Sequence, residues 1–288
     1  MIPNKFKAVI LLASLSALLL LMGNLIGGAS GLRIAFIMAL IMNFVSYFFS
    51  ESIVLRLYKA QPLDKTQYGW IFSDVSELCK KMNIPMPRLW IVDMPIANAF
   101  ATGRNPSHAS VVVTSGILKL LNEEELRGVL AHELSHVKNR DILVTTMAAT
   151  LATAIGYLAN MMQYAAMFGQ TSSDDSRKRT NPFAMIFAAM VMPFAAGILQ
   201  LALSRSREYL ADESGASYSH EPLALASALA KISNHKQFTP ATNPIEATTS
   251  PLFIINPLTG ATWAALFSTH PPVEKRIERL QEMAQKKF

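Results

Sequence analysis

Long hydrophobic runs alternate with more polar stretches along this chain of 288 residues. The first two runs, from Ala8 to Ile26 and from Ile34 to about Val54, lie on either side of the glycine-rich turn 27–31. Each is long enough to cross about 30 Å of hydrocarbon at roughly 1.5 Å per residue. The length of the first run, the polar Asn24 with no small-x-small processing site, and the second run that follows at once favour a retained membrane hairpin over a cleaved signal peptide. Basic residues flank the pair at both ends, which predicts that both ends are cytoplasmic.

Two further hydrophobic runs extend from about 142 to 168 and from 182 to 203. Their length favours spanning helices, but the basic cluster Arg177 to Arg179 between them is unusual for a short external loop. A shallow or re-entrant hairpin is therefore the alternative. The runs divide the chain into an N-terminal hairpin (1–55), a cytoplasmic part (56–140), a second hydrophobic hairpin (141–203) and a second cytoplasmic part (204–288).

The two cytoplasmic parts show periods of polar and apolar residues that predict short helices and strands. In the first part we expect an amphipathic helix at 64–82, a strand at 89–92 and a hairpin of 98–103 with 109–114. In the second part we expect a helix ending near Gly215, helices at 222–234 and 272–286, and a loop at 238–260. The fold class is a mainly α integral membrane protein with a small β-hairpin or sheet.

Composition supports a membrane protein, because 51% of residues are hydrophobic and only 16% are charged. Soluble domains carry about 25% charged residues. The net charge of +6 does not indicate nucleic acid as a partner, since no basic run is interleaved with aromatic residues. The lipid bilayer is the expected partner. Cys79 is the single cysteine, which excludes an internal disulfide and a thiolate zinc cluster.

The motif His-Glu-x-x-His at 132–136 carries the candidate chemistry. Asn122 and Glu125 can form a capping box, so the motif lies within a predicted helix. On a helix, His132 and His136 share one face and can bind one zinc ion, while Glu133 can reach a water molecule as general base. Gly128 lies one turn earlier, either to keep bulk away from the metal or simply for packing.

A catalytic zinc needs a third protein ligand and one open position. Glu208 and Asp212 lie four residues apart on a predicted helix, so either could coordinate while the other orients a ligand histidine. Glu208 could equally pair with an arginine. The ligands must share one side of the membrane, which two crossings between them or a re-entrant hairpin would allow.

Four blocks of the sequence, in order along nearly the whole chain, resemble the signature of the HtpX family. These are bacterial membrane-bound heat-shock zinc metalloproteases related to the eukaryotic CAAX prenyl endopeptidases. The blocks are Asn98 to Gly103, His132 to Asp141, Arg207 to Asp212 and His270 to Ile277. One departure is Arg140, where family members often have glycine.

The resemblance implies a gluzincin-like zincin domain on four hydrophobic helices, with one Zn²⁺ per chain. It implies that His132, His136 and Glu208 bind zinc and that Glu133 is the general base. Asp212 would orient a ligand, and His270 and Arg276 would stabilise the oxyanion. Without the resemblance, we would interpret His270 as a turn residue and Arg276 as a solvated charge. The substrate would add a β-strand beside Asn98, Ala99, Phe100, Ala101 and Thr102.

The expected function is zinc-dependent endopeptidase activity on misfolded or damaged membrane proteins, as part of a stress response. The expected location is the cytoplasmic face of the bacterial inner membrane, and membrane proteins or unfolded polypeptides are the expected substrates. One alternative is a selective processing protease of the prenyl-protease kind, although four hydrophobic segments would not form the large chamber of that class. Another is a non-catalytic zinc-stabilised membrane adaptor, which Glu133 and an apparently three-ligand site argue against.

Overall fold

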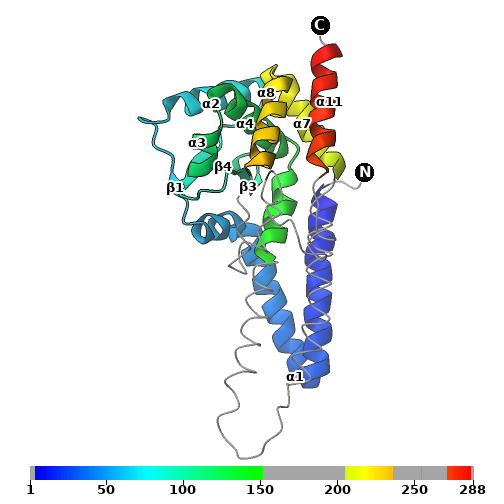
Figure 1. Cartoon of the computed structure of the whole chain (residues 1–288). Coiled ribbons are helices and arrows are strands. Elements are labelled where there is room, and N and C mark those ends of the chain that lie inside the picture. Colours follow the sequence, from blue (N-terminus) through cyan, green and yellow to red (C-terminus); the bar gives the residue numbers. More distant parts are fainter. Residues whose placement is uncertain (1–3, 152–204, 236–253, 255–270, 287–288) are drawn as a thin grey trace, which may run out of the picture.

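The computed structural model describes residues 4–151, 205–235, 254 and 271–286 (Figure 1). Most of the third and fourth hydrophobic runs, most of the predicted loop 238–260, and His270 lie outside the described residues. The described part is mainly helical and contains one small mixed sheet.

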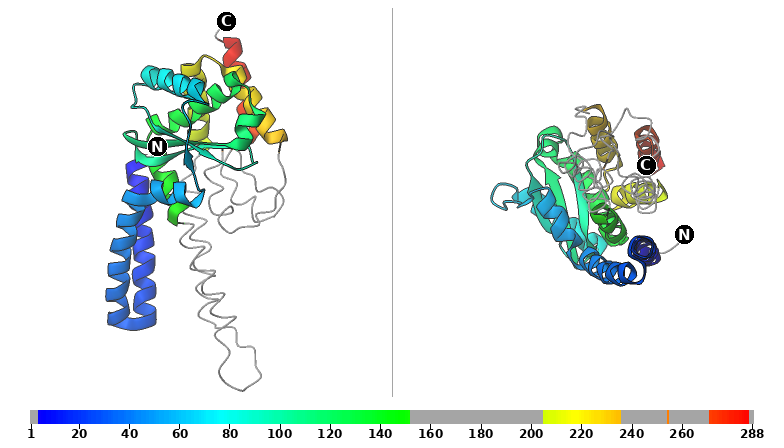
Figure 2. Two further views of the ribbon diagram at one scale, coloured as in Figure 1. Left: turned by 90° about the vertical axis from the view of Figure 1, so that its left-hand side faces the viewer. Right: turned by 90° about the horizontal axis from the view of Figure 1, so that it is seen from below.

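Helix α1 (Asn4–Leu57) forms the N-terminal hairpin that the hydrophobic pattern predicts. The chain reverses at Gly28, whose φ of 54° and ψ of −139° are accessible to glycine. The two arms approach closely, because a Cβ on Gly31 would lie 2.1 Å from the carbonyl oxygen of Gly23. Asn43 Nδ2 also donates a hydrogen bond of 2.9 Å to Ser16 Oγ across the pair. Figures 1 and 2 show both arms extending away from the sheet.

Within the described residues, one helix is long and apolar enough to cross a membrane, namely Gly28–Leu57. Large side chains on this arm, including Phe36, Phe44 and Phe49, are about half exposed. Exposed apolar surface on this scale is typical of contact with lipid or with another protein.

The sheet has four strands in the order β1-β2-β4-β3. Strands β3 (Ala99–Asn105) and β4 (His108–Thr114) form the predicted hairpin, and β2 (Arg88–Val92) pairs in parallel with β4. The short strand β1 (Gln61–Pro62), which the pattern did not predict, pairs with β2. Strand β3 therefore lies at one edge of the sheet.

Both faces of the sheet are covered. Ala101 and Val111 point into a core shared with helices α2 (Gly69–Met82) and α4 (Glu123–Lys138). Phe100 and Val112 point to the opposite face, where the end of α1 and Ala149 of the helix Asp141–Leu151 cover them. Strand residues thus alternate between the two faces. The sheet is packed directly against hydrophobic segments of the chain.

Two helices differ from the predicted pattern in the part of the chain from 56 to 140. Helix α2 begins at Gly69 and not at Asp64, because the Asp64 carboxylate accepts hydrogen bonds from the backbone and hydroxyl of Thr66 and forms a turn. The short helix α3 (Ser115–Leu120), capped by the Thr114 hydroxyl, was not predicted. The capping box at the start of α4 is confirmed, with both reciprocal hydrogen bonds between Asn122 and Glu125 present.

Residues 205–235 and 271–286 contain three helices, α7 (Arg205–Ser219), α8 (Pro222–Asn234) and α11 (Val273–Lys286). Helices α7 and α8 pack onto α4, and α11 packs onto α7 and α8. The prediction that a helix ends near Gly215 is wrong, because α7 continues to Ser219. Gly215 instead allows close approach of two helices, since a Cβ there would lie 2.8 Å from the backbone nitrogen of His132. Gly128 is a packing glycine, because a Cβ there would meet the backbone of Leu225 on α8 at 3.0 Å.

Candidate active site

His132 and His136 project from the same face of α4, as their spacing predicts. Their Nε2 atoms lie 3.2 Å apart. The side chain of His132 is 1% exposed and that of His136 is 15% exposed. The pair therefore opens to solvent on the side of His136.

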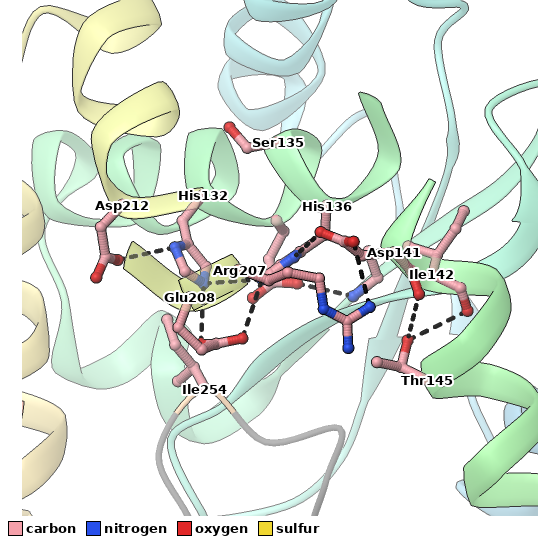
Figure 3. Close-up of polar contacts among 12 residues, drawn as sticks. His132, Ser135, His136, Asp141, Ile142, Thr145, Arg207, Glu208, Asp212 and Ile254 are labelled. Carbon is pink, nitrogen blue, oxygen red and sulfur yellow. Dashed lines mark hydrogen bonds and ion pairs between the residues drawn. The ribbon is translucent and has the colours of Figure 1, made fainter. Parts of the chain in front are cut away.

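Glu208 on α7 completes a cluster with the two imidazoles (Figure 3). Its Oε2 lies 3.8 Å from Nε2 of His132, and its Oε1 lies 3.5 Å from Nε2 of His136. These contacts depend on the close packing of α7 on α4, which Gly215 allows. Of the two acids four residues apart, Glu208 is the one that faces both histidines.

The geometry of this cluster fits a zinc ion. Tetrahedral coordination with bonds of about 2.0 Å to nitrogen and oxygen places ligand atoms about 3.3 Å apart. The measured separations of 3.2, 3.5 and 3.8 Å are close to that value. Three protein ligands leave a fourth position for water or substrate, as in catalytic zinc sites.

The charge of the site also fits a divalent cation. Six charged residues that are at most 5% exposed surround or flank the cluster, namely Glu133, Asp141, Arg207, Glu208, Asp212 and Arg276. When all are ionised, four carboxylates and two guanidinium groups leave two negative charges. Buried charge without compensation is costly, so a divalent cation would stabilise this arrangement.

Asp212 and Arg276 support His132 from behind. Nδ1 of His132 lies 2.9 Å from Oδ1 of Asp212, although the angle is poor for a hydrogen bond. Arg276 donates two hydrogen bonds of 2.7 Å to the same carboxylate. Burial alone would raise the pKa of Asp212, but the guanidinium of Arg276 holds this pKa below its usual range. Asp212 is therefore a carboxylate oriented by Arg276 against the first histidine.

A similar arrangement supports His136. Its Nδ1 lies 3.1 Å from Oδ2 of Asp141, whose Oδ1 lies 3.3 Å from Nη1 of Arg207. Burial disfavours the charged imidazole, but Asp141, Glu208 and Glu133 outweigh that effect and raise the pKa of His136 to about 9. Metal binding at Nε2 of His136 would displace a proton.

Glu133 lies beside the ligands and contacts the edge strand of the sheet. The backbone nitrogen of Ala101 on β3 donates a hydrogen bond of 2.9 Å to Glu133 Oε2. Burial raises the pKa of Glu133 to about 7, and the negative charge of Glu208 adds to this effect, whereas His136 opposes it. A carboxylate with a pKa near neutrality can both accept and return a proton.

Successive backbone N–H groups of β3 point alternately toward β4 and toward the free edge of the sheet. Asn98 exchanges hydrogen bonds with Thr114 on the side of β4. The N–H groups of Ala101 and Gly103 face away from β4, toward Glu133 and the hydroxyl of Thr146. Two of the five predicted substrate-binding residues, Ala99 and Ala101, direct their backbone groups toward the free edge. The other three, Asn98, Phe100 and Thr102, direct theirs toward β4.

A model of peptidase family M48 matches residues 65–284 of this chain. The chain belongs to peptidase family M48. Proteins named Protease HtpX homolog from Syntrophobacter fumaroxidans, Paraburkholderia phytofirmans and Aquifex aeolicus are 49%, 48% and 49% identical to it. These alignments cover 97%, 98% and 95% of this M48 peptidase and 99%, 97% and 91% of those relatives. The resemblance expected from the motifs is confirmed, and the chain is a metalloprotease.

The fold of this M48 peptidase is similar to that in the crystal structure of S. mikatae Ste24p, with a TM-score of 0.51 and 18% identity. The similarity covers 96% of this chain and 65% of that one. At this identity the likeness concerns the fold alone.

The structure brings together most of the site residues predicted for the M48 peptidase. His132, Glu133, His136, Glu208, Asp212 and Arg276 converge, whereas His270 lies outside the described residues. Reading Arg276 as a solvated charge, which the residues alone favour, is wrong, because this side chain is 0% exposed. The sequence patterns assigned no role to Asp141 or Arg207. The available signal was their place in the motifs, since Asp141 follows His136 closely and Arg207 directly precedes Glu208.

Proposed function

We propose that this metalloprotease is a zinc-dependent endopeptidase that hydrolyses misfolded or damaged membrane proteins at the cytoplasmic face of the bacterial inner membrane. The observation that carries the choice of metal is the near-tetrahedral spacing of His132, His136 and Glu208. The packing of the sheet against α1 and the helix Asp141–Leu151 supports a site close to the bilayer.

Zinc, when bound, supplies Lewis acidity to a water molecule and to the scissile carbonyl. Glu133 takes a proton from the attacking water as the C–O bond forms, and then returns it to the nitrogen of the leaving amine as the C–N bond breaks. The N–H of Ala101 holds the carboxylate of Glu133 in place for both transfers. The pKa of about 7 suits this double role.

The extended backbone of β3 supports an unfolded or locally unfolded chain as the substrate. A substrate strand can pair with backbone groups at the free edge, near Ala99 and Ala101, and so lie beside Glu133. Such pairing recognises extended backbone and not a particular sequence. This property suits the removal of damaged proteins, which share exposed chain but no common sequence.

Arg276 would contribute as a positive charge beside the ligands. Its Nη1 lies 3.7 Å from Oε2 of Glu208, and its Nη2 lies 3.5 Å from Nε2 of His132. The same guanidinium donates to Asp212 and to the carbonyl of Ile254. We propose that it orients Asp212 and, together with His270, favours the negative charge that develops on the carbonyl oxygen.

The test compares detergent-purified wild type with Glu133→Gln on a membrane-protein substrate, with zinc and with a chelator. Glutamine keeps an oxygen for the Ala101 N–H but cannot accept a proton, so we expect about 10²- to 10⁴-fold slower cleavage with zinc still bound. Zinc content is measured in both proteins. Equal cleavage by both, or undiminished cleavage with chelator, would refute the mechanism.

A further inference from the structure

Asp141 connects the second histidine of the motif to the helix that carries Glu208. One carboxylate oxygen lies 3.1 Å from Nδ1 of His136 and the other lies 3.3 Å from Nη1 of Arg207 (Figure 3). Asp141 is 3% exposed and Arg207 is 4% exposed, so water screens neither contact strongly. Arg207 directly precedes Glu208 in the chain.

The same arrangement occurs at both ligand histidines. On His132 the outer nitrogen faces Asp212, which Arg276 holds. On His136 the outer nitrogen faces Asp141, which Arg207 contacts. Each imidazole is thus backed by a carboxylate and an arginine, from different elements of the fold.

We propose that Asp141 and Arg207 are positioning residues that hold His136 and Glu208 in the geometry required for metal binding. The inference rests on the proposed function in one respect, namely that these ligands bind zinc. A carboxylate on Nδ1 fixes the tautomer that leaves the lone pair of Nε2 directed at the metal. Arg207 offsets the cost of burying that carboxylate and restrains the first turn of α7.

The positions of these residues in the chain give the pair a second role. Asp141 is the first residue of the helix Asp141–Leu151, which opens the third hydrophobic run. Arg207 follows the fourth run, in the first turn of α7. The contact between them therefore joins, at the metal site, the two segments that precede and follow residues 152–204. A change in the spacing of these segments would be transmitted directly to His136 and Glu208.

The experiment measures zinc affinity of the full-length protein in detergent by competition with a chromogenic chelator. Loss of a carboxylate that supports a ligand histidine typically weakens metal affinity 10- to 100-fold, and we expect this for Asp141→Ala. Asp141→Asn keeps an oxygen acceptor and should lose less. Arg207→Met should also lose affinity, and the double variant Asp141→Ala/Arg207→Met should be little worse than Asp141→Ala because the two act through one contact.

Asp74→Asn is the matched control. Like Asp141, Asp74 pairs with an arginine, since Nη1 of Arg127 lies 2.8 Å from Oδ1 of Asp74. This contact joins α4 to α2 and does not involve the histidines. The control should bind zinc as wild type does. Cobalt-substituted protein adds a spectroscopic measurement, because a reoriented His136 alters the visible absorption bands, whereas a loss of global stability without a change at the ligands leaves them unaltered.

The possible failures are distinguishable. If wild type binds zinc and cleaves substrate but Asp141→Ala matches it in affinity and cobalt spectrum, the positioning role is refuted while the proposed function stands. If wild type binds no zinc, or if Glu133→Gln cleaves normally, the proposed function itself fails. Equal losses in Asp74→Asn and Asp141→Ala would show general destabilisation and would also overturn the positioning role.

Discussion

Arg140 adopts a backbone conformation that suits glycine. Its φ of 58° lies in the left-handed region, between the end of α4 and the helix that begins at Asp141. For a residue with a β-carbon this conformation costs roughly 1–2 kcal/mol. Glycine adopts this conformation without that cost, but its unfolded chain has more conformational freedom, and this would cancel part of the gain in stability.

We predict that Arg140→Gly increases the free energy of unfolding by up to about 1 kcal/mol. Lys80→Gly replaces an exposed basic residue in the last turn of α2 and should instead decrease it by up to about 1 kcal/mol, since glycine is a poor helix former. Urea unfolding in detergent, followed by circular dichroism, measures both. A decrease of similar size in both variants would contradict the strain argument.

At the residue scale, sequence predicted the catalytic groups better than the groups that support them. His132, Glu133 and His136 follow a short motif whose spacing has a direct meaning on a helix. Arg276 lies on a helix rich in charge, so nothing local distinguishes it from solvated neighbours such as Lys275 and Glu278. Its burial depends on α7 and α11 meeting, which is a tertiary fact.

Helix α7 contacts α4 through Gly215, and this contact sets the position of Glu208. We predict that Gly215→Ala weakens zinc affinity and costs about 1–3 kcal/mol of stability, because the added Cβ would lie 2.8 Å from the backbone of His132. The backbone of α4 cannot move aside to make room for the added Cβ, as the end of a flexible side chain could. Isothermal titration with zinc and thermal unfolding measure the two effects.

Gly128→Ala provides the comparison for Gly215→Ala. Its Cβ would press on the backbone of Leu225 in α8, away from Glu208, so stability should fall while zinc affinity stays near that of wild type. Gly69→Ala, where the added Cβ meets nothing within 4 Å, should leave zinc affinity unchanged and cost no stability. Equal zinc affinity in all three variants would show that α7 does not set the site.

At the element scale, hydrophobic pattern and turn chemistry predicted most described helices and strands. The hairpin β3–β4 and helix α8 were found because alternation and Pro222 are local signals. Strand β1 was not, because two residues carry no period and it forms only through pairing with β2. The interpretation of Gly215 as a helix end was wrong, because glycine is common at helix ends and also where two helices pack closely.

For the whole molecule, a metal ion held by His132, His136 and Glu208 would join α4 to α7 and should stabilise the fold. We predict that a chelator lowers the thermal midpoint and that zinc at 100 times its dissociation constant stabilises by about 2.7 kcal/mol. Without the cation, the four buried carboxylates outnumber the two buried guanidinium groups, and protons on His136 and Glu133 must supply the balance. Scanning calorimetry in detergent measures the shift.

Glu208→Gln is the control for this stabilisation. It removes one ligand charge from α7, so zinc should raise its midpoint by less than that of wild type. A full shift in Glu208→Gln would indicate that the ion stabilises the protein from another site.

The arrangement of the whole molecule was predictable where length and hydropathy decide it. The hairpin of α1 follows from two apolar runs around a glycine-rich turn. The packing of the sheet against α1 and Ala149 was not predictable, because Val54, Phe100 and Val112 are ordinary apolar residues whose partners lie far along the chain. Alternation shows which side chains share a face but not what covers it.

Division of the ligands between α4 and α7 has a consequence for synthesis of the protein. His136 leaves the ribosome 72 residues ahead of Glu208, with both predicted hydrophobic runs of the second hairpin between them. At about 5–20 residues per second, the nascent chain spends about 4–14 s with two histidines but no third ligand. Until α7 has folded onto α4, the chain holds only part of the proposed ligand set. A protease assembled in this order is inactive while it is being made, when its own unfolded segments would be the nearest substrate.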